Sequence, residues 1–177
     1  MKIFAIPLSA AVVISLISIR SVPGEESKMS ALSIASPAFS HQGMIPSKHT
    51  CDSADVNPPL SFANIPEKSK SLALIVDDPD APMGTWVHWV AWNIGPGTEE
   101  IPENSVPQGT LQGTNDFKKQ GYGGPCPPSG THRYFFKLYA LDASLPLKAG
   151  ATKAQLEEAM KGHVLAQAEL VGLYRRK

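Results

Sequence analysis

The sequence contains little charge. Charged residues make up 18% of its 177 residues, and 16 basic side chains balance 16 acidic ones, so the formal net charge is 0. Domains that bind nucleic acids usually carry a basic patch or stripe. This balance therefore argues against nucleic-acid binding. A chain of this length is expected to form a single domain with a well-buried core.

Several short motifs of catalytic and metal sites are also missing. There is no His-x-His pair and no His-Glu-x-x-His sequence, which are spacings that bring metal ligands together. The Gly-x-Ser-x-Gly elbow of many hydrolases is absent as well. We therefore predict no metal and no cofactor, although two histidines and a carboxylate from distant positions would still allow an iron-binding triad.

Long apolar stretches are confined to the N-terminus. Lys2 is followed by residues 3–19, which are uncharged and mostly apolar, and then by Arg20. This is the pattern of a secretory signal peptide. The stretch is at the short limit for a membrane-spanning helix, so an uncleaved anchor formed by residues 3–19 is the alternative. We predict an exported protein, periplasmic or secreted, with a signal peptide over residues 1–24, a linker over residues 25–31 and a folded domain over residues 32–177.

Cysteine is scarce. The two cysteines, Cys51 and Cys126, both lie outside the predicted signal peptide. An even number of cysteines in an exported protein permits a disulfide. Two unpaired thiols are the alternative, and the sequence leaves both possibilities open.

Proline and glycine, by contrast, are plentiful. The 16 prolines and 14 glycines predict many turns and hence a β-rich fold. One helix is predicted from Thr152 to Lys161, because Thr152 and Gln155 match a capping box and Gly162 is a typical C-terminal stop. Residues 163–174 alternate between apolar and polar positions, which predicts a final strand, with a continued helix as the alternative.

The chain is organised around an acidic corner, the run Asp77-Asp78-Pro79-Asp80-Ala81-Pro82. Residues 72–76 before it form an apolar run that predicts a buried strand. The two prolines end that strand because each lacks an N–H and has a fixed φ angle. Residues 86–93 are predicted to form the returning strand, which brings His88 back towards the corner. Polar groups on a rigid corner between buried strands indicate a functional site.

A second stretch matches the first. Residues 121–130 form a loop dense in glycine and proline, and His132 follows at the start of an apolar strand. Both stretches place a histidine beside a stiff turn, and we expect them to meet in space. The preceding segment, residues 98–119, has no clear periodicity, and long loops of this kind are often functional. Its end, Asn115-Asp116-Phe117, is expected to frame the site.

These two stretches resemble the signature blocks of the phosphatidylethanolamine-binding protein family, in its bacterial branch often called Raf-kinase-inhibitor-like. The matching residues are Asp78-Pro79-Asp80-Ala81-Pro82 with Trp86 and His88, and Gly124 with Pro127-Pro128, Ser129-Gly130 and His132-Arg133-Tyr134. The similarity runs from about Ser33 to Arg175. It implies a mainly β fold of two packed antiparallel sheets with a short helix near the C-terminus.

The resemblance also implies a function. It suggests a non-enzymatic binding protein with a small pocket for an anionic or phosphorylated ligand, such as a phospholipid head group. The residues expected to bind this ligand are Asp78, Pro82, Trp86, His88, Gly124, Pro127, Pro128, His132 and Tyr134. Asp80 and Arg133 are expected to pair and brace the two stretches. A protein kinase or a protease is the suggested protein partner, and membrane contact is expected only through a lipid head group or an uncleaved leader.

Elementary chemistry agrees with such a pocket. A protonated histidine donates hydrogen bonds to an anion, and its ordinary pKa is about 6.5. A carboxylate such as Asp78 would orient the ring of a nearby histidine and raise its pKa. The glycines of the second stretch would let several backbone N–H groups point towards an anion.

A hydrolase is the competing hypothesis. In that interpretation Cys126 or Ser129 is the nucleophile and His132 is the base. A disulfide between Cys126 and Cys51 would remove the thiol version. Turnover of an ester or a phosphoester would distinguish a hydrolase from a binding protein.

Three other polar residues receive simpler interpretations. His41 and His49 lie in polar loops, where a histidine is usually solvated. Asp55 lies in a turn-rich segment, where an acid usually caps the turn through nearby backbone. None of the three is assigned to the site.

Overall fold

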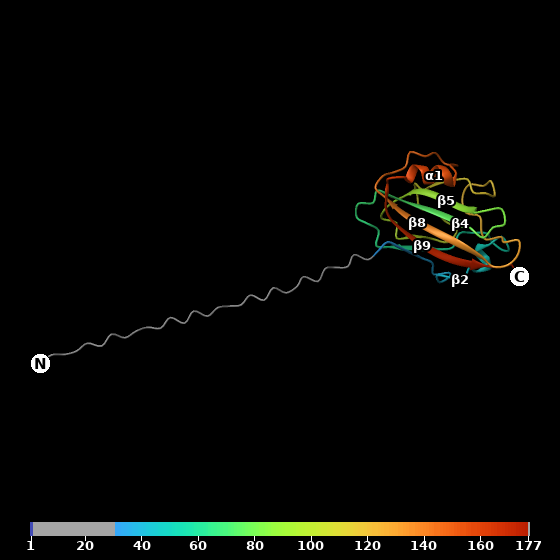
Figure 1. The fold of residues 1–177 in the computed structure, drawn as a ribbon, viewed down its shortest axis with the longest axis horizontal. Helices are drawn as coiled ribbons and strands as arrows, with labels where there is room; N and C mark the ends of the chain where they lie inside the picture. Colours follow the sequence, from blue (N-terminus) through green and yellow to red (C-terminus); the bar gives the residue numbers. More distant parts are fainter. Residues whose placement is uncertain (2–30, 177) are drawn as a thin grey trace.

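The structure is a computed structural model that describes Met1 and residues 31–176 (Figure 1). The predicted signal peptide beyond Met1 and the predicted linker up to residue 30 lie outside the described residues. Among the helices that are described, none is long and apolar enough to cross a membrane. The first strand of the folded domain, β1, begins at Ser33.

Two β-sheets form the domain. The larger has six strands in the order β2-β9-β8-β4-β5-β7, and the smaller has three in the order β1-β3-β6. In chain order the elements are β1 (Ser33–Ala35), β2 (Gly43–Met44), the 3₁₀ helix η1 (Ser47–His49), β3 (Leu60–Ala63), β4 (Ser71–Asp78), β5 (Trp86–Ile94), β6 (Glu100–Ile101), β7 (Leu111–Gln112), β8 (His132–Leu141), α1 (Lys153–Met160) and β9 (Val164–Tyr174). The predicted mainly β fold with two sheets and a short helix is confirmed. Its one departure among the described strands is β2, which pairs with β9 in parallel.

Strand β4 lies between β5 and β8 in the larger sheet (Figure 1), and all eight of its residues are buried. Leu72, Leu74 and Val76 belong to the core between the two sheets, whereas Ala73 and Ile75 belong to a second core beneath α1. Successive side chains of a strand alternate between its faces. A strand covered on both faces therefore needs a continuous apolar run, which β4 has. Each large aliphatic side chain that is fully buried stabilises the fold by about 1.5–3 kcal/mol.

Asp77 ends the face of β4 that points towards α1. Its carboxylate is 0% exposed and forms ion pairs with Lys137 of β8 (2.8 Å) and Lys153 of α1 (2.6 Å). A buried charge is tolerated when it is paired and hydrogen-bonded. These two ion pairs attach the helix to the sheet. The next residue, Asp78, lies on the opposite face of β4.

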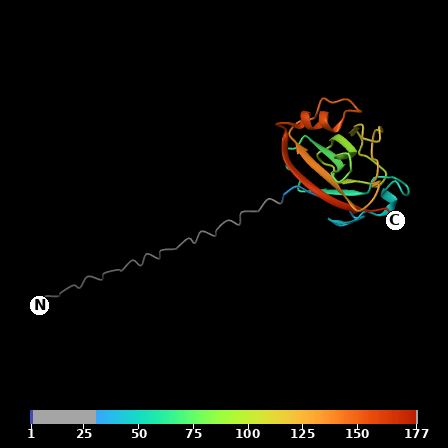
Figure 2. The same cartoon turned by 45° about the vertical axis from the view of Figure 1, so that its right-hand side comes forward.

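Both ends of α1 follow from the sequence. The N–H of Thr152 donates to Gln155 Oε1 (2.8 Å), and the N–H of Gln155 donates to Thr152 Oγ1 (3.3 Å), which is the predicted capping box. Gly162 adopts a positive φ of 78° just after the helix, and β9 begins at Val164. The predicted final strand is confirmed, and the alternative of a continued helix is wrong. Figure 2 shows β9, in red, curving past the orange β8.

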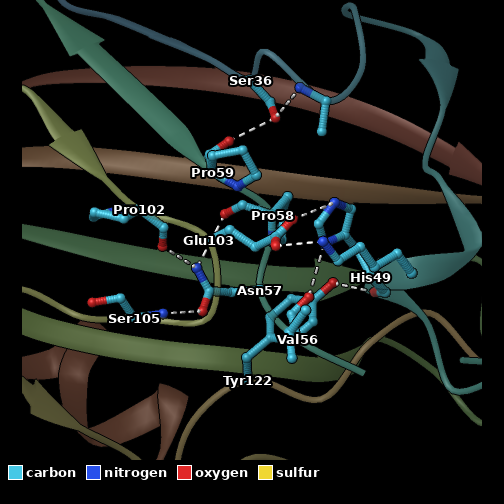
Figure 3. Close-up of polar contacts among 12 residues, drawn as sticks. Ser36, His49, Val56, Asn57, Pro58, Pro59, Pro102, Glu103, Ser105 and Tyr122 are labelled. Carbon is cyan, nitrogen blue, oxygen red and sulfur yellow. Dashed lines mark hydrogen bonds and ion pairs between the residues drawn. The ribbon is translucent and has the colours of Figure 1, made fainter. Parts of the chain in front are cut away.

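His49 is buried, so the expectation of a solvated histidine is wrong. Its Nδ1 lies 3.0 Å from the carbonyl oxygen of Val56, and its own carbonyl accepts from the hydroxyl of Tyr122 at 2.7 Å (Figure 3). In the same region the side-chain amide of Asn57 donates to the carbonyl of Pro102 at 3.0 Å. This network fastens the segment around residues 49–57 to two distant loops, one of which is the glycine-rich loop.

Candidate functional site

A pocket of about 340 Å³ lies where the acidic corner meets the glycine- and proline-rich loop. The end of β4, the turn after it, the start of β5 and the segments that lead into β8 all contribute to its walls. The lining residues are Asp78, Ala81, Pro82, Met83, Trp86, His88, Phe117, Cys126, Pro127, Pro128 and His132. The expectation that the two stretches meet in space is confirmed.

Asp78 and His132 form a buried pair in this pocket. Nδ1 of His132 lies 2.7 Å from Oδ2 of Asp78, and both side chains are less than 10% exposed. The other oxygen of Asp78 accepts the backbone N–H of Asp80 at 2.8 Å, which is a turn typical of aspartate. Because the last residue of β4 and the first of β8 hold the two groups, strand ends rather than flexible loops fix the pair. A carboxylate accepts, so Nδ1 of His132 carries the proton.

His88 is held by a backbone group instead. Its Nδ1–H donates to the carbonyl of Gly123 at 2.7 Å, and its ring contacts Phe117 and Tyr134 edge-on, with ring centroids 5.4 and 5.2 Å apart. Burial lowers the pKa of His88, although the Gly123 carbonyl and the Asp78 carboxylate act in the opposite direction. The expectation that a nearby carboxylate would raise this pKa is therefore wrong for His88, because desolvation outweighs the charge of Asp78.

The two rings share one property. Nδ1 of each is committed to a protein acceptor, and Nε2 of neither ring has a hydrogen-bond partner among residues 31–176. In a neutral imidazole whose Nδ1 carries the proton, Nε2 is an acceptor, and it becomes a donor when the ring is protonated. Two Nε2 atoms in one small pocket thus remain for a ligand.

Asp80 and Arg133 form the expected pair beside the pocket. Nε and Nη2 of Arg133 donate to the two carboxylate oxygens of Asp80 at 2.9 and 2.6 Å, and the backbone N–H of Arg133 adds a bond of 3.0 Å. Hydrogen bonds from the guanidinium lower the pKa of Asp80 to about 2. The guanidinium also lies over the ring of Phe135, 5.6 Å from its centroid. The pair joins the acidic corner to β8 without entering the pocket.

The walls of the pocket are mostly apolar. Four of the apolar lining residues were expected, namely Pro82, Trp86, Pro127 and Pro128. Phe117 also lines the pocket, as the position of residues 115–117 suggested. Its neighbours hold it there, since Asp116 Oδ2 accepts the N–H of Val87 at 2.8 Å and the amide of Asn115 donates to the carbonyl of Gly121 at 3.0 Å. Met83, a highly exposed residue at the rim, was missed because nothing in its sequence context sets it apart.

Gly124 was expected to bind the ligand, but it does not line the pocket. Its N–H donates to Asp55 Oδ1 at 2.7 Å, and the N–H of Gly123 donates to the carbonyl of His88 at 2.9 Å. These two N–H groups are therefore engaged by protein acceptors, and they are not among the backbone donors that the loop would direct towards an anion. Glycine is required at position 124 because a Cβ there would lie 2.5 Å from the carbonyl oxygen of His49. Asp55 was expected to cap its own turn, but it accepts a hydrogen bond from a residue 69 positions later in the chain.

Tyr134 lies behind the pocket rather than in its wall. Tyr134 is 1% exposed, and its ring packs edge-on against the ring of His88. Burial, with a further contribution from the charge of Asp78, raises the pKa of Tyr134. Its hydroxyl and the indole N–H of Trp86 are buried without a hydrogen-bond partner in the described part of the chain. Tyr134 therefore supports His88 from behind, and of the two donors only that of Trp86 belongs to a residue that lines the pocket.

Cys51 and Cys126 form a disulfide, with their Cα atoms 5.4 Å apart, so the alternative of two unpaired thiols is wrong. Cys126 therefore offers no thiolate while the bridge is intact, although it lines the pocket. Ser129 is exposed and has no hydrogen bond to His132 or to any other described residue. Neither Cys126 nor Ser129 is therefore available as a nucleophile activated by His132.

No metal site accompanies the pocket in the described residues. Among them, no three side chains of His, Cys, Asp or Glu come close enough together to hold a metal ion. The histidines instead face one carboxylate and one carbonyl, which are acceptors for their ring protons.

Comparison with known proteins agrees with the geometry. The family model for phosphatidylethanolamine-binding protein matches residues 35–175. A UPF0098 protein of Methanothermobacter thermautotrophicus is 53% identical over 150 residues, covering 82% of this chain and 99% of the relative. The UPF0098 protein PH1269 of Pyrococcus horikoshii is also 53% identical, over 165 residues that cover 88% of this chain and 82% of the relative.

Two solved structures share the fold. CT736 of Chlamydia trachomatis, described as a homologue of phosphatidylethanolamine-binding protein, superposes with a TM-score of 0.80 at 43% identity, covering 83% of this chain and 99% of that one. YbcL of Escherichia coli, described as a member of the mammalian family, gives a TM-score of 0.79 at 30% identity, covering 84% of this chain and 100% of that one. The chain therefore belongs to the phosphatidylethanolamine-binding protein family.

Proposed function

We propose that this protein is a non-enzymatic binding protein whose pocket holds a small anionic group, either a free phosphate-like ligand or the phosphate of a lipid head group. Family membership supports a binding role in general. The observation that carries the finer proposal is the pair of histidines, His88 and His132, each with Nδ1 engaged by the protein and Nε2 left for a ligand.

The electrostatics of the pocket favour an anion that carries a proton. With both imidazoles neutral, the pocket offers two acceptors beside the carboxylate of Asp78, and a fully ionised phosphate would be repelled. A phosphomonoester has a second pKa of about 6, so near neutral pH part of it retains a hydroxyl that donates to an acceptor. Protonation of an imidazole turns its Nε2 atom from an acceptor into a donor, which also favours an anion. Both changes strengthen phosphate binding as the pH falls.

The size and walls of the pocket support a small ligand group. A volume of about 340 Å³ is at the lower end of typical small-molecule sites. Trp86 lines the pocket, and its indole N–H is buried without a partner among the described residues; an unpaired buried donor costs about 1–3 kcal/mol. An anion within reach of this N–H would remove part of that cost. The apolar rim formed by Pro82 and Met83 suits the carbon atoms that follow a head group.

We also propose that the protein is exported and is periplasmic or secreted. The disulfide supports it, because such bridges persist mainly in oxidising compartments. As a protein partner, the family resemblance suggests a kinase or a protease. Membrane contact would then occur through a bound lipid head group or through an uncleaved leader.

The test is calorimetric titration with inorganic phosphate and with phosphoethanolamine at pH 6 and pH 8. We expect weaker binding at pH 8. Replacing His132 by alanine should weaken binding about tenfold or more, because a charge-assisted hydrogen bond contributes about 1.5–3 kcal/mol. The matched control is His41→Ala, since His41 is exposed and lies outside the pocket; it should bind like the parent protein.

Two further measurements separate the sources of the ligand and the competing function. Vesicles of phosphatidylethanolamine should compete with phosphoethanolamine if a lipid head group is the ligand, and they should not compete if only free phosphates bind. Equal affinities of the parent protein and His132→Ala would contradict the proposal. Turnover of a phosphoester or carboxylic ester that is lost in Ser129→Ala would instead establish the hydrolase.

A further inference from the structure

One wall of the pocket has few attachments to the rest of the domain. Residues 126–131, here called the wall loop, are the last part of the glycine- and proline-rich loop and its link to β8, and they carry Pro127 and Pro128 of the pocket lining. No hydrogen bond joins any of these six residues to another described residue. The last backbone hydrogen bond before the wall loop is at Pro125, whose carbonyl accepts the N–H of Cys51 at 3.2 Å. The next ones are formed from His132 onwards, where β8 pairs with β9. Prolines contribute to this gap because they have no N–H.

Within the wall loop, the disulfide and the packing of the buried Pro127 are the attachments that remain. The disulfide joins Cys126 to Cys51, and the segment around Cys51 is firmly held. Asp52 accepts the hydroxyl of Tyr174 at 2.7 Å, and Asp55 accepts the N–H of Gly124 at 2.7 Å. The disulfide therefore links the wall loop, which has no hydrogen bonds of its own, to the segment around Cys51, which has several.

The wall loop also separates two hollows. Pro128 lines the pocket on one side and, on the other, a second cleft of about 690 Å³. The second cleft is also lined by Asp52, Tyr174 and Arg176. A shift of the wall loop would change the shape of both hollows at once, whereas the opposite wall is held by β4 and β5.

We propose that the Cys51–Cys126 bridge is a redox switch that controls the ligand pocket. In the oxidised protein the bridge holds the proline wall in place, and in the reduced protein the wall loop is released and the pocket loses its shape. Cys51 is exposed, which makes the bridge reachable from solvent. The ligand part of this inference rests on the proposed function, but the release of the loop does not.

The reductant is a dithiol, such as a thiol–disulfide exchange protein or dithiothreitol. One thiolate of the dithiol attacks a sulfur of the bridge and forms a mixed disulfide, and the other sulfur leaves and takes a proton. The second thiol of the reductant then displaces the remaining cysteine, which also takes a proton. Two electrons and two protons pass to Cys51 and Cys126, and the dithiol becomes a disulfide.

The first test needs no ligand. The protein is digested briefly with proteinase K before and after treatment with dithiothreitol, and the cleavage sites are found by mass spectrometry. We expect the oxidised protein to resist cleavage within residues 126–131 and the reduced protein to be cut there at least tenfold faster, with an unchanged far-ultraviolet circular dichroism spectrum. Equal cleavage rates in this segment, or loss of the β spectrum on reduction, would show that the bridge is only structural and would overturn the proposal.

The second test uses phosphoethanolamine as the probe. Reduction should weaken its binding at least tenfold, and reoxidation should restore the affinity. In the matched variant C51S/C126S the affinity should equal that of the reduced protein, and dithiothreitol should have no effect. If that variant does not fold, reduced parent protein with both thiols alkylated replaces it. Unchanged affinity on reduction overturns the switch. Absence of binding by the oxidised protein contradicts the proposed function alone, and the digestion then decides the switch.

Discussion

The two histidines of the pocket are held by different kinds of group. His132 donates to the carboxylate of Asp78, a side chain with a full charge, whereas His88 donates to the carbonyl of Gly123, a backbone dipole. Both rings are almost completely buried. The comparison shows that burial and a hydrogen bond do not make two histidines equivalent, because only one of them has a charged partner in direct contact.

The difference has a practical meaning for mutational work. The partner of His132 can be removed by changing one side chain, while the partner of His88 cannot be removed without changing the backbone. Substitutions at Asp78 should therefore act mainly on the ring of His132, because they remove its hydrogen bond, whereas burial is the main influence on the pKa of His88. Two predictions use this difference and a third concerns the outer Asp80–Arg133 pair, in order of expected effect.

Asp78→Ala should cause the largest change. It removes the acceptor of the buried His132 Nδ1 and of the partly buried Asp80 N–H. A buried group left without a partner costs about 1–3 kcal/mol of folding free energy. Urea unfolding monitored by tryptophan fluorescence measures the loss. His88 should keep its own hydrogen bond, so its NMR signals should move less than those of His132.

An exposed pair of the same geometry provides the control. His163 and Asp142 also lie 2.7 Å apart, but both side chains are 46% exposed. Water can replace either partner, so Asp142→Ala should cost less than about 1 kcal/mol. Equal losses in Asp78→Ala and Asp142→Ala would mean that the buried pair gains nothing from its position.

The second prediction concerns pH and His88. Burial lowers the pKa of His88 in the folded state, so between that value and the unfolded pKa of about 6.5 the unfolded chain binds more protons than the folded one. The contribution of His88 to stability is therefore complete above about pH 6.5 and is lost as the pH falls below it, by about 1.4 kcal/mol for each unit of pKa depression. An NMR titration of the ring should give a midpoint below 6.5.

The pH dependence can be assigned to this residue with a variant. In His88→Gln the decrease in stability between pH 7 and pH 5 should be smaller than in the parent protein. An NMR midpoint at or above the ordinary value for histidine would show that Asp78 and Gly123 outweigh desolvation after all.

The smallest effect is expected at the outer pair. Asp80→Ala removes the partner of Arg133, but both side chains are partly exposed, so the loss at pH 7 should stay below about 1 kcal/mol. Because the pKa of Asp80 is lowered from 3.8 to about 2, this contribution is present above pH 3.8 and disappears as the pH falls towards 2. Thermal unfolding of both proteins at pH 7 and pH 3 would measure it, and a larger difference at pH 3 would contradict the assignment.

Much of the fold could be predicted because local patterns determine it. The apolar run of residues 72–76 needs cover on both faces, the prolines of the acidic corner end it, and Thr152 with Gln155 marks the start of the helix. The approach of Asp78 to His132 could be expected from two similar motifs. Each of these features depends on residues close in sequence or on two strong motifs.

Other features depend on contacts that carry no local signal. The N–H of Gly124 reaches Asp55 only because the turn-rich segment around Cys51 folds over the glycine-rich loop. The burial of His49 has the same origin, and the parallel pairing of β2 with β9 joins residues about 130 positions apart. The lowered pKa of His88 likewise reflects burial by Phe117 and Tyr134, which no neighbour in the sequence announces.

The two acids at the end of β4 have a consequence for folding itself. Asp77 points to Lys137 of β8 and Lys153 of α1, and Asp78 points to His132, because neighbouring side chains of a strand lie on opposite faces. A shift of β4 by one residue against β8 would exchange the faces of both acids and leave charges buried without partners. A molecule in which β4 has the wrong register would therefore also lack the Asp78–His132 pair that lines the pocket.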